Sequence, residues 1–188
     1  MTFYLKQRPI AINIIVMMLC WMASSFCFYM INFQLQYLPG NIYANSYSSA
    51  SADIIATTTS GFIFKWIGVK KSLIYAFSVA TVGLALICFW GYAATNDHGQ
   101  TWTLPILVLV SKIGISSAFN AVYLGNSVLF PTLFTATSMG ICNIFARTAS
   151  IFAPLVSTIP GVFPMYIALF LSAVTLVSVF FLQRPIDM

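Results

Sequence analysis

Residues 10–34 read "IAINIIVMMLCWMASSFCFYMINFQ", a stretch without a charged side chain. A helix needs about 20 apolar residues to cross the hydrocarbon core of a bilayer. The whole chain has the same character, because 60% of its 188 residues are hydrophobic and only 6% are charged, with a mean hydropathy of +0.94. Soluble domains carry about 25% charged residues. The composition therefore predicts an integral membrane protein in a lipid bilayer.

Six apolar segments follow one another and predict an all-α fold, a single six-transmembrane-helix bundle over residues 1–188. The segments cover about residues 10–34, 49–67, 72–94, 103–125, 134–158 and 161–182. The breaks between them carry Gly, Pro and Asn, which favour turns. They fall at residues 38–41, 67–71, 95–100, 130–132 and 159–164.

The positive charges before, after and at the ends of these segments predict the orientation. With six spans, all of them fall on one face: Lys6, Arg8, Lys65, Lys70, Lys71 and Arg184. The opposite loops carry only Asp97 and His98. Lys and Arg are enriched in cytoplasmic loops. Both termini are therefore expected on the cytoplasmic side, or on the matrix side in a mitochondrion.

The sequence contains few of the side chains that enzymes use for hydrolytic or metal-dependent catalysis. Four cysteines lie inside apolar segments without metal-ligand or disulfide spacing, namely Cys20, Cys27, Cys88 and Cys142. The chain has no Glu, and its one histidine, His98, falls in a loop. We therefore expect no enzyme, no cofactor and no metal site. The net charge of +5 reflects the loop bias rather than a nucleic-acid surface, since no wetted basic patch or known module is present.

Three ionisable residues remain at membrane depth, Asp53, Lys112 and Arg147. Each costs about 2.5–3.5 kcal/mol at a helix centre on insertion scales. Such residues face a bundle interior or a water-filled cavity and mark functional sites.

Polar and aromatic residues recur at helical spacing around these charges, and residues three or four apart share a helix face. The three stripes are Lys112, Ser116, Asn120 and Tyr123; Asn143, Arg147, Ser150 and Pro154; and Trp21, Ser25, Phe28 and Asn32, with Tyr29 alongside. Facing inward, they would line a pocket with aromatic walls and two positive charges. Such a pocket suits an amphipathic organic anion, whose carboxylate an arginine can bind bidentately.

Other interpretations of the same residues remain open. Lys112 could extend its ammonium to the membrane interface. Asp53 could cap its helix or pair with a lysine. Arg147 could have a purely structural role, and the aromatic stripe could be core packing.

Two stretches carry a resemblance to a known family: "KIGISSAFNAVYLGNSVLFPT" (residues 112–132) and "MGICNIFARTASIFAPLVS" (residues 139–157). They resemble the tenth and eleventh helices of the organic anion and cation transporters, solute carrier family 22, of the major facilitator superfamily. Residues 21–45 and 52–73 are similar to the seventh helix and to the eighth helix with the turn into the ninth. The resemblance covers the C-terminal six of the family's twelve helices.

The resemblance implies a transporter of two six-helix bundles around a central site that opens alternately to either side. In the family, an arginine at the position of Arg147 goes with anion and zwitterion transport. Lys112, Tyr29, Asn120 and Tyr123 fall on pocket-side positions. Together with Arg147 and with Trp21 from the first stripe, these four residues form the predicted substrate-binding set of six, and Asp53 is a possible charge partner.

Departures from the family pattern concern its cytoplasmic latch of ion pairs. Lys65 replaces an acid and Trp66 replaces a base, while Val128 and Thr135 stand where an acid and an arginine are expected. A basic residue of some anion transporters is Thr57 here. The latch pairs therefore cannot form, although the pocket charges remain.

Two functions stay open at this point. The first is half of a major-facilitator-type transporter of organic ions, with anions or zwitterions favoured, in the plasma membrane. It would need a partner chain or a second copy, because alternating access requires two bundles. The alternative is a non-transporting structural subunit of a large membrane complex, such as a mitochondrial respiratory assembly in the inner membrane.

Overall fold

The computed structural model describes residues 8–37, 42–91, 103–159 and 163–183. Within these ranges the chain forms six α-helices and one π-helical segment, η1. Their bounds are α2 Arg8–Gln34, α3 Ile42–Ile67, α4 Val69–Leu86, η1 Ile87–Gly91, α5 Thr103–Leu129, α6 Thr132–Ser157 and α7 Phe163–Phe180. No strand occurs in these ranges, so the predicted all-α fold is confirmed.

The largest difference between the helix bounds and the predicted segments is at α3, which begins at Ile42 rather than near residue 49. Its first turns are rich in Ser, Asn and Tyr, so hydropathy does not mark them. In these turns Asn45 and Ser49 are buried, in line with Ala52 and Ala56 further along the helix. Tertiary packing here overrides a weak local signal.

Five helices are long and apolar enough to cross a membrane, by length and composition: α2, α4, α5, α6 and α7. The helix that misses this criterion is α3, because its 26 residues include many Ser and Thr. A helix of that size is about 39 Å long, which is sufficient for a span. The chain is thus an all-α membrane bundle, and the sixth span at α3 stays a prediction.

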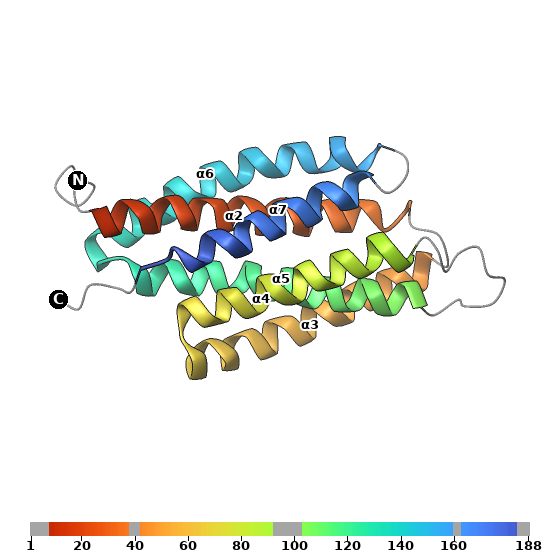
Figure 1. Ribbon diagram of the computed structural model, residues 1–188, viewed down its shortest axis with the longest axis horizontal. Coiled ribbons are helices and arrows are strands. Elements are labelled where there is room, and N and C mark those ends of the chain that lie inside the picture. Colours follow the sequence, from red (N-terminus) through yellow and green to blue (C-terminus); the bar gives the residue numbers. More distant parts are fainter. Residues whose placement is uncertain (1–7, 38–41, 92–102, 160–162, 184–188) are drawn as a thin grey trace.

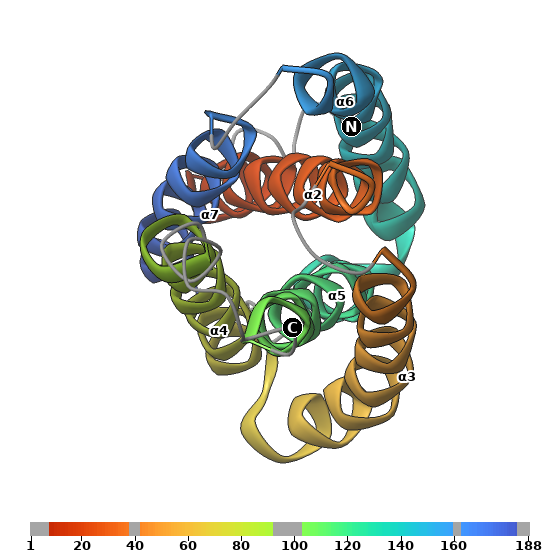
Figure 2. The ribbon, with the colours of Figure 1, turned by 90° about the vertical axis from the view of Figure 1, so that its right-hand side faces the viewer.

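Two helices form the centre of the arrangement. Helices α2 and α5 contact each other, and the others pack around them. Helices α4 and α7 lie on one side, where they contact each other, whereas α3 packs on α5 and α6 packs on α2 (Figures 1 and 2). Figure 2 shows α3 and α6 on the side of the α2–α5 pair opposite to α4 and α7.

Glycines lie at the contact between α4 and α5 and leave no room there for a side chain. A Cβ placed on Gly114 would lie 2.2 Å from the backbone nitrogen of Ala80, and one on Gly83 would lie 2.5 Å from Cα of Ser111. Small residues let membrane helices approach backbone to backbone. Here they hold α4 firmly against α5.

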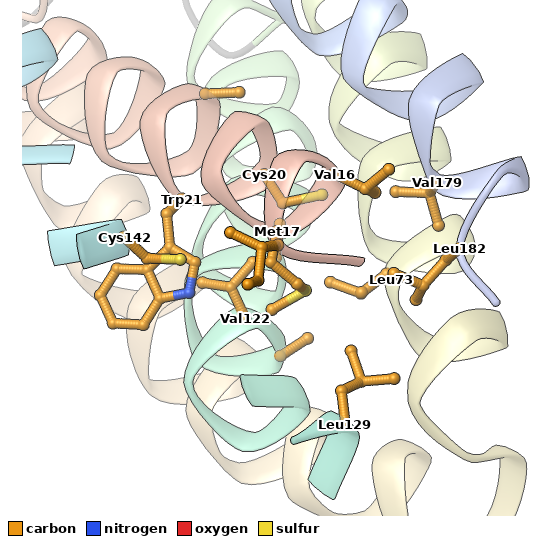
Figure 3. Packing of buried hydrophobic residues seen from close by; sticks show 14 of the residues in the cluster. Val16, Met17, Cys20, Trp21, Leu73, Val122, Leu129, Cys142, Val179 and Leu182 are labelled. Carbon is orange, nitrogen blue, oxygen red and sulfur yellow. The ribbon is translucent and has the colours of Figure 1, made fainter. Parts of the chain in front are cut away.

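The core beside these contacts joins α2 to α5, α6 and α7. Figure 3 shows Met17, Cys20 and Trp21 of α2 with Val122 of α5 and Cys142 of α6. Cys20, Cys27, Cys88 and Cys142 are all buried free thiols, as expected for small core residues.

At one end of the bundle, side chains of α4 and α2 bond to the backbone at and after the end of α7. Lys70 Nζ donates to the carbonyls of Phe180 at 2.6 Å and Leu182 at 2.8 Å. Asn13 at the start of α2 bonds twice to the backbone of Gln183. The start of α2, the α3–α4 junction and the end of α7 therefore meet, as Figure 1 shows.

This end carries the predicted basic face, and we call it the basic end. Lys65, Lys70 and Lys71 lie at the α3–α4 junction. Lys6 and Arg184, like Asp97 and His98, lie outside the described residues. The cytoplasmic orientation of this end stays a prediction.

Candidate functional site: two cations beside an aromatic row

A charged cluster joins α2, α3 and α5 and consists of Lys112, Asp53, Asn32 and Ser116. Lys112 is fully buried, and its Nζ lies 3.8 Å from Asp53 Oδ2. The same ammonium donates to Asn32 Oδ1 at 2.6 Å. Ser116, one turn after Lys112, donates to the other oxygen of Asp53. The cluster therefore gives both charges partners on neighbouring helices.

The cluster ties α3 to the centre of the bundle. Taking two ions out of water is costly, and a buried pair persists only with good geometry and further hydrogen bonds. Lys112 meets this condition through its hydrogen bond to Asn32. The ring centroid of Phe28 also lies 3.8 Å from Lys112 Nζ. A cation over an aromatic face is attracted by the ring. The side chain of Asp53 stays 38% exposed, so water can reach it.

An aromatic row runs along the α2–α5 interface and consists of Trp21, Tyr123, Phe119, Phe28 and Tyr29. The ring centroids follow one another at 4.2, 5.4, 5.3 and 5.6 Å. Aromatic pairs at such separations and tilts are favourable. The row forms a continuous apolar path from the core to Tyr29.

Arg147 stands at the far end of this row on α6. Its Nη1 donates to the hydroxyl of Tyr29 across a long 3.4 Å, and the residue is exposed. A guanidinium has five N–H donors, and this is its one side-chain hydrogen bond to the described residues. Among those residues the one ion pair is Lys112–Asp53, so Arg147 keeps an unneutralised charge.

Polar side chains remain uncovered on the side of the bundle opposite α4 and α7. We call this surface the open face; it is formed by α2, α3, α5 and α6 and carries Asn32, Asp53, Thr57, Asn120 and Arg147. Thr57 and Arg147 are exposed and Asn120 is half-buried. Asn120 Nδ2 donates to Thr57 Oγ1 at 3.5 Å. Polar groups at this depth require contact with protein or water rather than lipid.

The predicted site residues fall into two environments. Arg147, Tyr29, Asn120 and Asp53 reach the open face, whereas Lys112 and Trp21 are buried. Trp21 is 1% exposed and stacks on Tyr123 inside the core. A ligand could therefore touch Lys112 or Trp21 only after a movement of the bundle, and their substrate roles stay predictions.

Four residues of the charged cluster and the aromatic row were not in the predicted set. Phe28, Asn32 and Ser116 lay on predicted stripes, but nothing in the sequence indicated that Phe28 and Asn32 would contact Lys112 or that Ser116 would contact Asp53. Phe119 was missed because the stripe was drawn through Asn120. The spacing of Lys112, Ser116, Phe119 and Tyr123 is also helical, and it would have found the aromatic row.

The latch positions of the family lie toward the basic end, and none of them forms an ion pair within the described ranges. Trp66 is 85% exposed and Val128 is 50% exposed. The hydroxyl of Thr135 donates to the carbonyls of Phe130 and Pro131 at the start of α6. Thr135 thus bonds locally at the start of α6 rather than to another helix.

No group of three or more metal-ligating side chains occurs in the part of the chain that the structure describes. The expectation that the protein uses no metal or cofactor stays a prediction.

Comparison with known proteins finds no matching family model but several similar transporters. Solute carrier family 22 member 15 of Xenopus tropicalis is 29% identical over 154 residues, 81% of this chain and 28% of that protein. Solute carrier family 22 member 4 of mouse is 26% identical over 79% of this chain and 26% of its own length. Mouse organic anion transporter 3 is 28% identical over 73% of the chain and 25% of its own length.

The chain thus spans less than a third of the length of the relatives it matches. These relatives are solute carriers rather than enzymes, in agreement with the expected class. Neither they nor the structure supply an observation that favours a structural subunit or a mitochondrial location. Together with the apolar helices, they confirm an integral membrane protein. Over most of its length, the chain is similar to part of a solute carrier family 22 transporter.

Proposed function

We propose that the chain is one six-helix bundle of a transporter of small organic ions, with anions or zwitterions as substrates. The relatives named above are solute carriers of a family that includes an organic anion transporter. By the same likeness, the plasma membrane is its expected location. The proposal places the substrate on the open face, beside Arg147.

The exposed charge of Arg147 is the observation that carries this proposal. A guanidinium cannot lose its proton in a protein, so burying it without a partner would be very costly. Its single long hydrogen bond to Tyr29 leaves most of its donors available. A carboxylate can accept two of them in parallel.

The charges of the site favour an anionic group on the substrate. Lys112 and Asp53 neutralise each other, so the net charge of the site is that of Arg147. The aromatic row begins at the Tyr29 hydroxyl that Arg147 contacts, which offers apolar area to the body of the ligand. A zwitterion could add a cationic group near the half-exposed Asp53.

This site needs a second bundle to become a transport pathway. Alternating access moves one bundle against another around a central site. The uncovered polar residues of the open face support such a neighbour, because lipid cannot solvate them. The second bundle could be a partner chain, a second copy of this chain or a continuation of the same polypeptide.

Uptake of 6-carboxyfluorescein, an aromatic carboxylate, by cells expressing the full chain tests the proposal. Arg147→Ala should abolish uptake, and Arg147→Lys should recover it partly, because a point charge lacks the planar fork. Thr148→Ala is the matched control, since its exposed hydroxyl bonds only to the Ile144 carbonyl. Surface expression of each variant should be equal.

Normal uptake by Arg147→Ala at equal surface expression would contradict the site. The need for a second bundle has its own test. Crosslinking in the same cells should capture the chain in a particle larger than one bundle. Uptake by an isolated single bundle would refute that need.

A further inference from the structure

A groove at the basic end lies outside the proposed substrate site. It has a volume of about 530 Å³ and runs between the α3–α4 junction, the end of α5 and the residues after α7. Known ligand pockets measure about 300–1,000 Å³, so the groove has the size of a binding site. None of its lining residues is among those that define the open face, so the groove is separate from the transport proposal.

The groove has apolar walls and a basic rim. Its walls include Phe64, Ile67, Val128 and Leu182, and its rim carries Lys70 and Lys71. Described residues contribute no acid to it. This combination fits a ligand with an apolar body and a negatively charged head.

The two rim lysines differ in their availability. Lys70 Nζ already donates to two carbonyls at and after the end of α7, so two of its three N–H donors are used within the protein. Lys71 is exposed and forms no hydrogen bond or ion pair with the described residues. Its ammonium is therefore the principal group that can meet an anion.

The groove lies where helices long and apolar enough to cross a membrane come to an end. The spanning helices α5 and α7 end beside it at Leu129 and Phe180. Trp66, 85% exposed at the end of α3, is of the type enriched at the headgroup level. Basic pockets between membrane helices on the cytoplasmic side bind anionic headgroups.

We propose that this groove binds an anionic phospholipid of the cytoplasmic leaflet. An acyl chain lies along Phe64, Ile67 and Val128, and the headgroup meets Lys71. Because the groove spans the α3–α4 junction and the end of α7, the bound lipid bridges helices from the two sides of the bundle.

Native mass spectrometry of the full chain in mild detergent, with added phosphatidylserine or phosphatidylcholine, tests this site. Wild type should retain phosphatidylserine preferentially. Lys71→Gln should lower that retention about fivefold, the effect of one lysine near an anionic surface. Lys65→Gln is the matched control, because it removes the same charge from the same end outside the groove, and it should change retention less than twofold.

Two further measurements separate the lipid from other ligands. Val128→Trp fills the apolar part of the groove and should lower retention of both lipids, while its unfolding temperature stays that of wild type. Glycerophosphoserine, the headgroup without acyl chains, should not displace phosphatidylserine at equal concentration. Full displacement by it would indicate a site for soluble phosphate esters and overturn the proposal. Equal losses in Lys71→Gln and Lys65→Gln, or none in either, would overturn it as well.

Discussion

The two sides of the α2–α5 pair are built on different principles. On the side of α4, glycines bring backbones together, and a Cβ on Gly114 would lie 2.2 Å from Ala80. On the open face, most residues of α6 are not buried by the rest of the bundle. In the most apolar part of its span Phe134–Ser157, only 17% of the residues are buried. We call the side of α4 and α7 the closed side. Its close helix contacts hold the bundle together, whereas the open face exposes Arg147. The difference indicates which residues are available to a ligand and which serve stability.

The largest effect on stability is expected at the closed side. Gly114→Ala should lower the free energy of unfolding by about 3 kcal/mol, because the added methyl meets backbone that cannot move aside. Gly140→Ala on α6 is the control, since nothing lies within 4 Å of its new Cβ. Thermal unfolding in detergent measures both. Equal unfolding temperatures of the two variants would contradict the claim that the α4–α5 contact is more tightly packed than α6.

The next effect is expected in the charged cluster. Asp53→Asn should lower stability by about 2 kcal/mol, because it leaves the buried ammonium of Lys112 without its counter-charge. The loss is smaller than for a wholly buried pair, since Asn32 still accepts from Lys112. The double variant Asp53→Asn/Lys112→Met should recover most of it. A double variant less stable than Asp53→Asn would show that Lys112 has another role.

Arg147→Ala should leave stability within about 0.5 kcal/mol of wild type, as is usual for exposed positions. The residue packs little and has one long hydrogen bond. The same unfolding measurement checks this expectation. A loss comparable to that of Asp53→Asn would favour a structural role for Arg147.

The smallest effect is expected at Tyr29. Tyr29→Phe keeps the ring in the aromatic row but removes the hydroxyl that accepts from Arg147. A long hydrogen bond to an exposed group contributes at most about 1 kcal/mol, so the affinity for an aromatic carboxylate should change less than about fivefold. Fluorescence titration with 6-carboxyfluorescein measures it. A change above tenfold would mean that Tyr29 itself contacts the ligand.

The fold could be predicted from the sequence because membrane spans are encoded locally. An apolar run such as residues 10–34 identifies a helix without knowledge of its neighbours. The start of α3 could not be found in this way, because Asn45 and Ser49 become helical through packing. Hydropathy identifies segments rich in apolar side chains, and it misses α3 because this helix contains many Ser and Thr residues.

The site was only partly predictable for a related reason. Helical spacing places residues on one face of their own helix, and it predicted that Arg147 and Lys112 both face the interior; the structure buries Lys112 and leaves Arg147 exposed. Which charge is paired depends on the rotation of neighbouring helices. The sequence therefore left open whether Asp53 pairs with a lysine and which of the two cations stays available; the structure pairs Lys112.

Direct binding of 6-carboxyfluorescein to the purified, assembled protein tests the central claim, that Arg147 rather than Lys112 receives the anion. Two variants each remove one of these cations. Arg147→Gln should weaken binding at least tenfold, the scale of a charge-assisted hydrogen bond. Asp53→Asn/Lys112→Met removes the other cation without changing the net charge and should leave the affinity within about threefold. The opposite pattern, strong binding by Arg147→Gln and loss in the double variant, would contradict the account.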